Sequence, residues 1–194
     1  NKAMELSGAK IFPVDSEHSA IWQCLVGENF NDIRRIILTG SGGPFRSRDL
    51  DTFDDISVKE ALKHPNWDMG EKISIDSATM MNKCLEVIEA YWLFQLDPEK
   101  IDIVIHPQSI VHSMVEFNDG SVKAQMGVPD MKVPIQYALT FPSHSKSPWE
   151  RLDFLSCRDL TFEGPDYDRF PALQLAYKAL KKGGTASAAL NLSN

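Results

Sequence analysis

Residues 101–126 read IDIVIHPQSIVHSMVEFNDGSVKAQM, and this stretch decides the fold class. The run at 101–106 is rich in Ile and Val and predicts a buried strand. Residues 110–117 and 121–126 have the composition of strands, and Asn118-Asp119-Gly120 lies between them. Because an Asp-Gly pair favours the positive φ angles of a tight turn, the two runs predict a β-hairpin.

Another buried strand is predicted at 33–39, where the sequence reads IRRIILT. It leads into GSGGPF at 40–45, so we expect a glycine loop at its carboxyl end. A further strand is expected at 9–14, ending at Val14. Strands mixed with helices predict an α+β fold with a mixed β-sheet and helices packed mainly on one face, and not a doubly wound parallel sheet.

Helices are expected between and after these strands. Asp15 or Ser16 would cap a helix at 16–27, and Ser57 would form a capping box with Glu60. Residues 76–96 contain no Gly or Pro and predict the strongest helix. Further helices are predicted at 130–141, with Pro134 in the first turn, at 172–184, and from 185 onward. The stretch 142–171 is rich in Ser, Pro and charge and predicts a connecting arm.

The composition excludes several classes of function. The net charge of −7 argues against broad binding to nucleic acids or anionic membranes. Cys24, Cys84 and Cys157 are far apart and form no CxxC pair, so we expect a reducing compartment and neither a disulfide framework nor a zinc site. No apolar run approaches the roughly 20 residues that span a bilayer.

The helix at 76–96 carries a polar face beside an apolar stripe. Helical spacing places Asn82, Lys83 and Glu86 together, next to a stripe of Met81, Leu85, Ile88 and Trp92. One interpretation is a solvated face with a Lys–Glu pair, and the other is a binding face. Asp76 and Ser77 are expected at the start of this helix, where backbone N–H groups favour an anion.

The glycine loop is a second candidate for an anion site. TGSGGPF at 39–45 exposes backbone amides and the Ser41 hydroxyl, but its spacing is neither that of a P-loop nor GxGxxG, and a structural turn is the alternative. His64, in HPNWDMG, belongs either to a lid or to a packed connection. For His106 and His112 the residue pattern favours a structural role.

PVDSEHS at 13–19 supports two interpretations. Asp15 and Glu17 belong either to an acidic helix start or to a metal site. With Glu86 they would make three carboxylates, the donors of Mg²⁺ or Mn²⁺ and not of zinc.

Several segments together resemble one enzyme family, 1-deoxy-D-xylulose 5-phosphate reductoisomerase of the non-mevalonate isoprenoid pathway. The resemblance covers nearly the whole chain from about residue 9. The matching segments are PVDSEHSAIWQCL (13–25), LTGSGGPFR (38–46), HPNWDMGEKISIDSATMMNKCLEVIEAYWLF (64–94), IHPQSIVHSMVEFNDGSVKAQMGVPDMKVPI (105–135) and LTFEGPDYDRFPALQLA (160–176).

The resemblance implies a role for individual residues. Asp15, Glu17 and Glu86 match the metal carboxylates and, with His64, the catalytic residues. The matching substrate-binding residues are Ser16, Ser41, His64, Trp67, Ser77, Asn82 and Lys83. Met131 matches a position near the nicotinamide, and Pro129 lies beside it in the same motif.

The implied reaction converts 1-deoxy-D-xylulose 5-phosphate to 2-C-methyl-D-erythritol 4-phosphate with Mg²⁺ or Mn²⁺ and NADPH. The resemblance also implies an oxidoreductase that forms a homodimer and is located in the bacterial cytoplasm, a plastid protein being the weaker alternative. We expect a catalytic domain at 1–142, a linker at 143–165 and the start of a C-terminal helical domain at 166–194.

This sequence departs from the family pattern at both ends. The family's NADPH-binding domain with its Gly-rich turn is not found, and the last helical domain stops soon after it begins. We therefore expect a truncated protein that is inactive alone. The alternatives are a chain that only self-associates and, less favoured, a phosphatase-like metal hydrolase.

Overall fold

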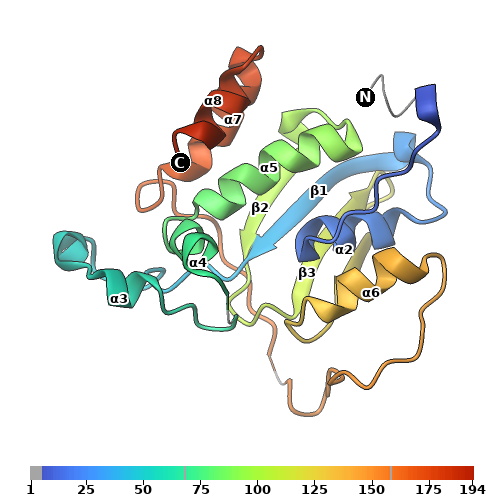
Figure 1. The fold of residues 1–194 in the computed structure, drawn as a ribbon, viewed down its shortest axis with the longest axis horizontal. Helices are drawn as coiled ribbons and strands as arrows, with labels where there is room; N and C mark the ends of the chain where they lie inside the picture. The colour runs from blue at the N-terminus through green and yellow to red at the C-terminus, as the bar shows by residue number, and fades with distance from the viewer. Residues whose placement is uncertain (1–5, 68, 158) are drawn as a thin grey trace.

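The computed structural model describes residues 6–67, 69–157 and 159–194, and a four-stranded sheet lies at its centre (Figure 1). The strand order is β2-β1-β3-β4, for β1 Ile33–Gly40, β2 Ile101–Ile105, β3 Val111–Phe117 and β4 Val122–Met126. β1 pairs with β2 in parallel and with β3 antiparallel, and β3 pairs antiparallel with β4. The predicted mixed α+β sheet is confirmed.

Helices lie over one face of this sheet, as Figure 1 shows for α2 and α5. The α-helices are α2 Ser16–Leu25, α3 Val58–Ala61, α4 Glu71–Ala78, α5 Met81–Phe94, α6 Lys132–Thr140, α7 Ala172–Lys182 and α8 Ala186–Leu192. Short 3-10 helices occur at Phe30–Asp32, Leu50–Asp55 and Pro98–Lys100. Among the described residues, no helix has the length and apolar character that crossing a membrane requires.

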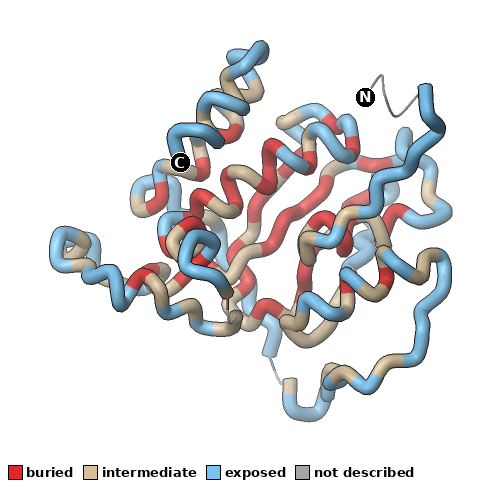
Figure 2. The backbone as a smooth tube through the Cα atoms, viewed as in Figure 1, coloured by how far each residue is buried: buried red, intermediate tan, exposed pale blue. Residues whose placement is uncertain are grey.

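The core lies between α5 and the sheet, where buried segments of both face each other (Figure 2). Ile36 and Leu38 of β1 are fully buried and pair with Ile101 and Ile103 of β2. Full burial of each such side chain contributes about 1.5–3 kcal/mol. Because side chains alternate along a strand, Arg35 and Ile37 lie on the opposite face of the sheet.

Most of the predicted local signals are confirmed. Gly120 has a φ of 86° in the hairpin turn, as the tight turn between β3 and β4 requires. Asp15 caps α2, and Ser57 and Glu60 form the capping box of α3. Pro134 lies in the first turn of α6, where its missing N–H breaks no helical hydrogen bond.

The predicted strand at 9–14 is wrong, since the structure has no strand there. Ile11 and Val14 are exposed instead. The Phe12 ring packs at 5.1 Å from Trp22 and 5.4 Å from Phe141, measured between ring centroids. The apolar residues of this segment therefore pack against side chains of α2 and the end of α6 rather than against a strand.

The predicted single helix at 76–96 is also wrong, because it consists of two helices, α4 and α5. Met80 lies between them in the left-handed conformation with a φ of 59°, and only 3% of it is exposed. Thr79 Oγ1 bonds back to the Ile75 carbonyl, which closes the end of α4. The predicted apolar stripe fails at Trp92, which is 66% exposed at the far end of α5.

The described part of the arm, 142–157 and 159–171, contains no helix or named strand. It attaches to the sheet at one place, where Glu163 pairs with Ile105 through two backbone hydrogen bonds of 3.0 and 2.9 Å. Arg46 donates to both Glu163 carboxylate oxygens at 2.7 and 2.8 Å. The arm is thus bonded beside the glycine loop, whereas the linker limits of 143–165 stay a prediction.

Candidate functional site

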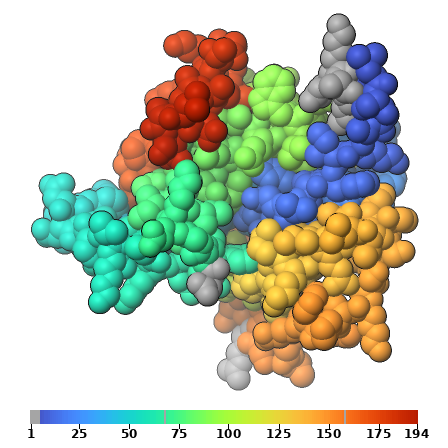
Figure 3. All heavy atoms as spheres, viewed as in Figure 1, coloured from blue at the N-terminus to red at the C-terminus, as the bar shows by residue number. Residues whose placement is uncertain are grey.

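A pocket of about 200 Å³ lies where β1 and β2 end, between α2, α4 and α5. Figure 3 shows the segments of α2 in blue, α5 in green and α6 in yellow-orange meeting on one face of the molecule. Ligand sites commonly form at the carboxyl ends of parallel strands. The residues that line this pocket include Asp15, Ser16, Glu17, Ser41, His64, Trp67, Ser77, Asn82, Lys83 and Met131.

The first turn of α2 provides two of the carboxylates. Asp15 Oδ1 accepts a hydrogen bond from the Glu17 backbone N–H at 3.1 Å, as a helix cap does. Ser16 Oγ donates to Glu17 Oε2 at 2.6 Å, so this hydroxyl orients Glu17. The two interpretations of the acidic start are therefore compatible, because Asp15 caps the helix and also lines the pocket.

The third carboxylate, Glu86, comes from α5 and is 1% exposed. Oxygens of Asp15, Glu17 and Glu86 all lie within 4.8 Å of one another. Lys83 Nζ lies 3.2 Å from Glu17 Oε1 and 2.5 Å from Glu86 Oε2. A solvated polar face on α5 is excluded, because both Lys83 and Glu86 are buried.

Burial and mutual repulsion control the charges of this cluster. Burial, with the nearby charge of Glu17, raises the pKa of Glu86 well above its ordinary value. Burial alone would lower the pKa of Lys83, but the charges of Glu17 and Glu86 outweigh it and raise that pKa. An ammonium therefore stands beside carboxylates that need a positive charge to stay ionised in a buried site.

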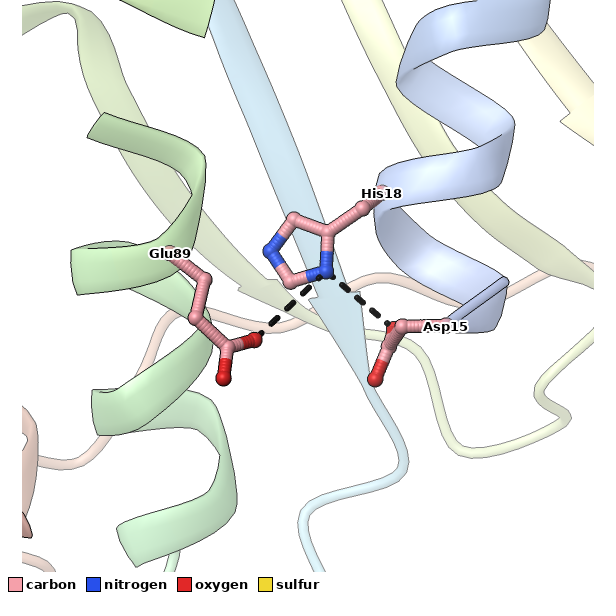
Figure 4. Close-up of side chains that lie close together, drawn as sticks. All are labelled: Asp15, His18 and Glu89. Carbon is pink, nitrogen blue, oxygen red and sulfur yellow. Dashed lines mark ion pairs between the residues drawn. The ribbon is translucent and has the colours of Figure 1, made fainter. Parts of the chain in front are cut away.

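His18 was not singled out in the sequence, yet it joins the two elements that bear the carboxylates (Figure 4). Its Nε2 donates to the Glu86 backbone carbonyl at 3.0 Å, since a carbonyl only accepts. Its Nδ1 lies 3.4 Å from Asp15 Oδ1 and 3.8 Å from Glu89 Oε2. Burial would lower the pKa of His18, but the hydrogen bond and charge of Asp15 raise it to about 9.

The residues expected to bind an anion line the same pocket, although not as the sequence suggested. Asp76 and Ser77 lie in the last turn of α4 and not at a helix start, so that prediction is wrong. Asn82 Nδ2 donates to Glu86 Oε1 at 2.6 Å, and Lys83 donates to the other oxygen of the same carboxylate. Both donors are thus bonded to a residue that was predicted to bind metal.

The glycine loop brings Ser41 to the pocket through a close backbone approach. Gly43 has a φ of 68°, and a Cβ there would lie 2.6 Å from the Ser77 carbonyl oxygen. Only glycine fits both conditions without a shift of the backbone. The glycine loop therefore forms one wall of the pocket. The close approach of its backbone to Ser77 explains why residue 43 is glycine.

His64 connects the loop after α3 to the glycine loop. Its Nδ1 accepts from the backbone N–H groups of Asn66 and Trp67 at 3.1 and 2.9 Å, so Nε2 carries the proton and donates to Ser41 Oγ at 3.0 Å. Burial lowers the pKa of His64 and favours this neutral form. Trp67 lies with its ring centroid 6.2 Å from that of His112.

Part of the pocket wall was not predicted from the sequence. Thr39, His106, Ser109 and His112 line the pocket, whereas Pro129 is not among the lining residues. His106 ends the run IDIVIH, and its Nδ1 donates to the Thr161 carbonyl at 2.9 Å. Its place directly after β2 was the available signal, because β2 runs parallel to β1 and ends at the same edge.

Two family models match the chain. Residues 11–94 match the 1-deoxy-D-xylulose 5-phosphate reductoisomerase C-terminal domain, and residues 126–194 match the DXP reductoisomerase C-terminal domain. The reductoisomerase of Chloroherpeton thalassium is 62% identical over 98% of this chain, and that of Ruminiclostridium cellulolyticum is 59% identical over 97%. The chain spans about half the length of these curated relatives, 49% of each.

Solved structures agree with the sequence relatives. The reductoisomerase of Zymomonas mobilis in complex with NADPH is 50% identical, with a TM-score of 0.90 over 98% of this chain and 49% of that one. A DOX-P reductoisomerase in complex with NADPH, fosmidomycin and magnesium is 48% identical, with a TM-score of 0.92 over the same shares. The chain belongs to the 1-deoxy-D-xylulose 5-phosphate reductoisomerase family.

Proposed function

We propose that this chain provides the metal and substrate site for converting 1-deoxy-D-xylulose 5-phosphate to 2-C-methyl-D-erythritol 4-phosphate. The observation that carries the proposal is the convergence of Asp15, Glu17 and Glu86 beside a pocket that is also lined by Ser41, Ser77, Asn82 and Lys83. A phosphorylated hydroxy-ketone needs both features, since one end bears oxygens that chelate a cation and the other a dianion.

The donor set fits Mg²⁺ or Mn²⁺. All three groups offer carboxylate oxygen, which hard divalent cations prefer, and no cysteine lines the pocket in the part of the chain that the structure describes. A divalent cation held there supplies Lewis acidity toward a carbonyl and an adjacent hydroxyl. His18, bonded to Asp15 and to the Glu86 backbone, would hold the two elements at this separation.

The other pocket residues would bind and orient the substrate. Ser41 and Ser77 offer hydroxyls, and Asn82 and Lys83 offer an amide and an ammonium, for the phosphate. Binding energy from this remote group can position the reacting carbons. His64 and Trp67, on the loop before α4, would cover the substrate and exclude water, and Ser16 lies beside the carboxylates.

For the whole protein we propose NADPH as the hydride donor, on the basis of the relatives solved with it. Met131, 37% exposed at the pocket, is the described residue that we expect near the nicotinamide. We expect no NADPH oxidation by this chain alone, and the cytoplasmic location stays a prediction.

A Mn²⁺ titration tests the metal site. Electron paramagnetic resonance measures the free Mn²⁺ during the titration. We expect this chain to bind Mn²⁺ saturably. We expect Glu86→Gln and Asp15→Asn each to lower the Mn²⁺ affinity by at least about ten-fold. Glu99→Gln, an exposed acid on the 3-10 helix Pro98–Lys100, is the matched control. Fosmidomycin should bind only with the metal present. Equal Mn²⁺ affinity in all four proteins would refute the site.

Self-association is a second candidate function, because no described helix lies on the sheet face opposite α5. Ile37, Met114 and Ala124 are cross-strand neighbours on that face, where Ile37 is buried, Met114 is half-buried and Ala124 is exposed. Beside them Arg35 is bonded to Glu116 and Asp102, each at 2.6 Å. We propose that this face forms a homodimer contact.

A further inference from the structure

The cation site and the anion site of the pocket share one residue. Glu86 accepts from Asn82 Nδ2 at 2.6 Å through one carboxylate oxygen and from Lys83 Nζ at 2.5 Å through the other. Asn82 and Lys83 are the amide and the ammonium proposed to bind a phosphate, whereas Glu86 is a proposed metal ligand. In this structure the two groups of residues are bonded to each other.

Lys83 occupies a defined position between two of the carboxylates. Its Nζ lies between Glu86 and Glu17, and the side chain is 4% exposed. Its Cε passes 2.9 Å from the point where a Cβ of Gly40 would stand, so the bare glycine leaves room for the lysine stem. The ammonium therefore provides the positive charge beside two of the three carboxylates.

A divalent cation at these carboxylates would compete with that ammonium. The ammonium already lies between Glu86 Oε2 and Glu17 Oε1, two of the carboxylates that would hold the cation. Like charges a few ångströms apart repel strongly in a buried site. Lys83 would then turn away from Glu86, and a cation held by Glu86 Oε1 would also remove the acceptor of Asn82. The pocket that both residues line also contains the hydroxyls of Ser41 and Ser77, which an anion can share with them.

We propose that Asn82 and Lys83 exchange partners, from Glu86 without a divalent cation to a phosphate or phosphonate dianion with it, so that cation and dianion bind cooperatively. The inference rests on the proposed function, because it takes both ligands from it. Each ligand removes an obstacle to the other: the cation frees the donors, and the dianion holds them away from Glu86. Linkage requires the two enhancement factors to be equal.

Methylphosphonate tests the coupling, since it has a dianion but no hydroxamate to chelate the metal. Mn²⁺ affinity is measured without and with saturating methylphosphonate, and methylphosphonate affinity without and with Mn²⁺. We expect both to tighten by about five-fold or more, and by the same factor. A protein-free titration corrects for direct association of Mn²⁺ with methylphosphonate. An unchanged or weakened affinity overturns the coupling.

Variants separate this inference from the proposed function. Lys83→Met should bind Mn²⁺ more tightly than the wild type and show no response to methylphosphonate. Asn82→Ala, at a half-buried position, should reduce the coupling factor and serves if Lys83→Met fails to fold. Lys146→Met, on the arm, is the control and should keep the full factor. If no protein binds Mn²⁺, the proposed function itself fails; if Mn²⁺ binds and both variants keep the wild-type factor, only the coupling fails.

Discussion

Gly43 shows how one residue fixes the pocket wall. Replacing it by Ala adds a Cβ at 2.6 Å from the Ser77 carbonyl oxygen, at a φ of 68° that side chains rarely adopt. The unfavourable φ alone costs about 1–2 kcal/mol, and the backbone contact adds to it. We predict that Gly43→Ala lowers the free energy of unfolding by at least about 2 kcal/mol, measured by urea denaturation.

Gly70 is the matched control for this substitution. It caps α4 with a φ of −61°, and a Cβ there would meet no atom within 4 Å. Gly70→Ala should change the free energy of unfolding by less than about 1 kcal/mol. Equal destabilisation by both substitutions would show that the close approach at Gly43 is not a source of strain.

The sequence predicted the position of a site residue where its partners are near in sequence or lie at helical spacing from it. Asp15 and Glu17 lie two residues apart in the sequence. The helical spacing of Asn82, Lys83 and Glu86 placed these three residues together correctly. The role of Lys83 beside Glu17 was not predictable, because it depends on how α2 packs near α5. His106 was interpreted as structural for the same reason, since its place in the pocket comes from the pairing of β2 with β1.

At the scale of elements, the break between α4 and α5 was not predictable from the sequence pattern. Neither Gly nor Pro marks it, and the left-handed residue is Met80. Helical periodicity alone cannot show such a break, since the side chains on both sides suit a helix. The break matters because it places Ser77, at the end of α4, beside Asn82 and Lys83 in the first turn of α5.

The end of α5 offers a test of the same backbone conformation away from the pocket. Gln95 caps the helix with a φ of 52° and is exposed. Because glycine adopts this conformation without strain, Gln95→Gly should raise the free energy of unfolding by about 0.5–1 kcal/mol. Gln95→Ala, which keeps a Cβ, is the control and should not stabilise. Thermal unfolding monitored by circular dichroism compares the stability of both variants with that of the wild type. A Gln95→Gly variant no more stable than the wild type would contradict the prediction.

At the scale of the whole molecule, the sheet divides the surface into two unlike faces. Alternation along β1 places Ile36 and Leu38 on the helix-covered face and Arg35 and Ile37 on the other. The sequence predicted only a buried strand here, because Ile36, Ile37 and Leu38 form a continuous apolar run. It did not supply the strand order, because pairing across the sheet depends on segments more than 60 residues apart, such as β1 and β2. The face that no described helix covers could therefore be recognised only in the folded chain.

The sheet face that no described helix covers predicts self-association of the chain. Met114 lies between Ile37 and Ala124 across the strands, so an arginine there would place an unpaired charge in the middle of the proposed contact. We expect the wild type to sediment as a dimer in analytical ultracentrifugation and Met114→Arg as a folded monomer. Leu139→Arg, at an 81% exposed position on α6, introduces the same charge elsewhere and should remain dimeric. A monomeric wild type, or a dimeric Met114→Arg, would exclude this face as the contact.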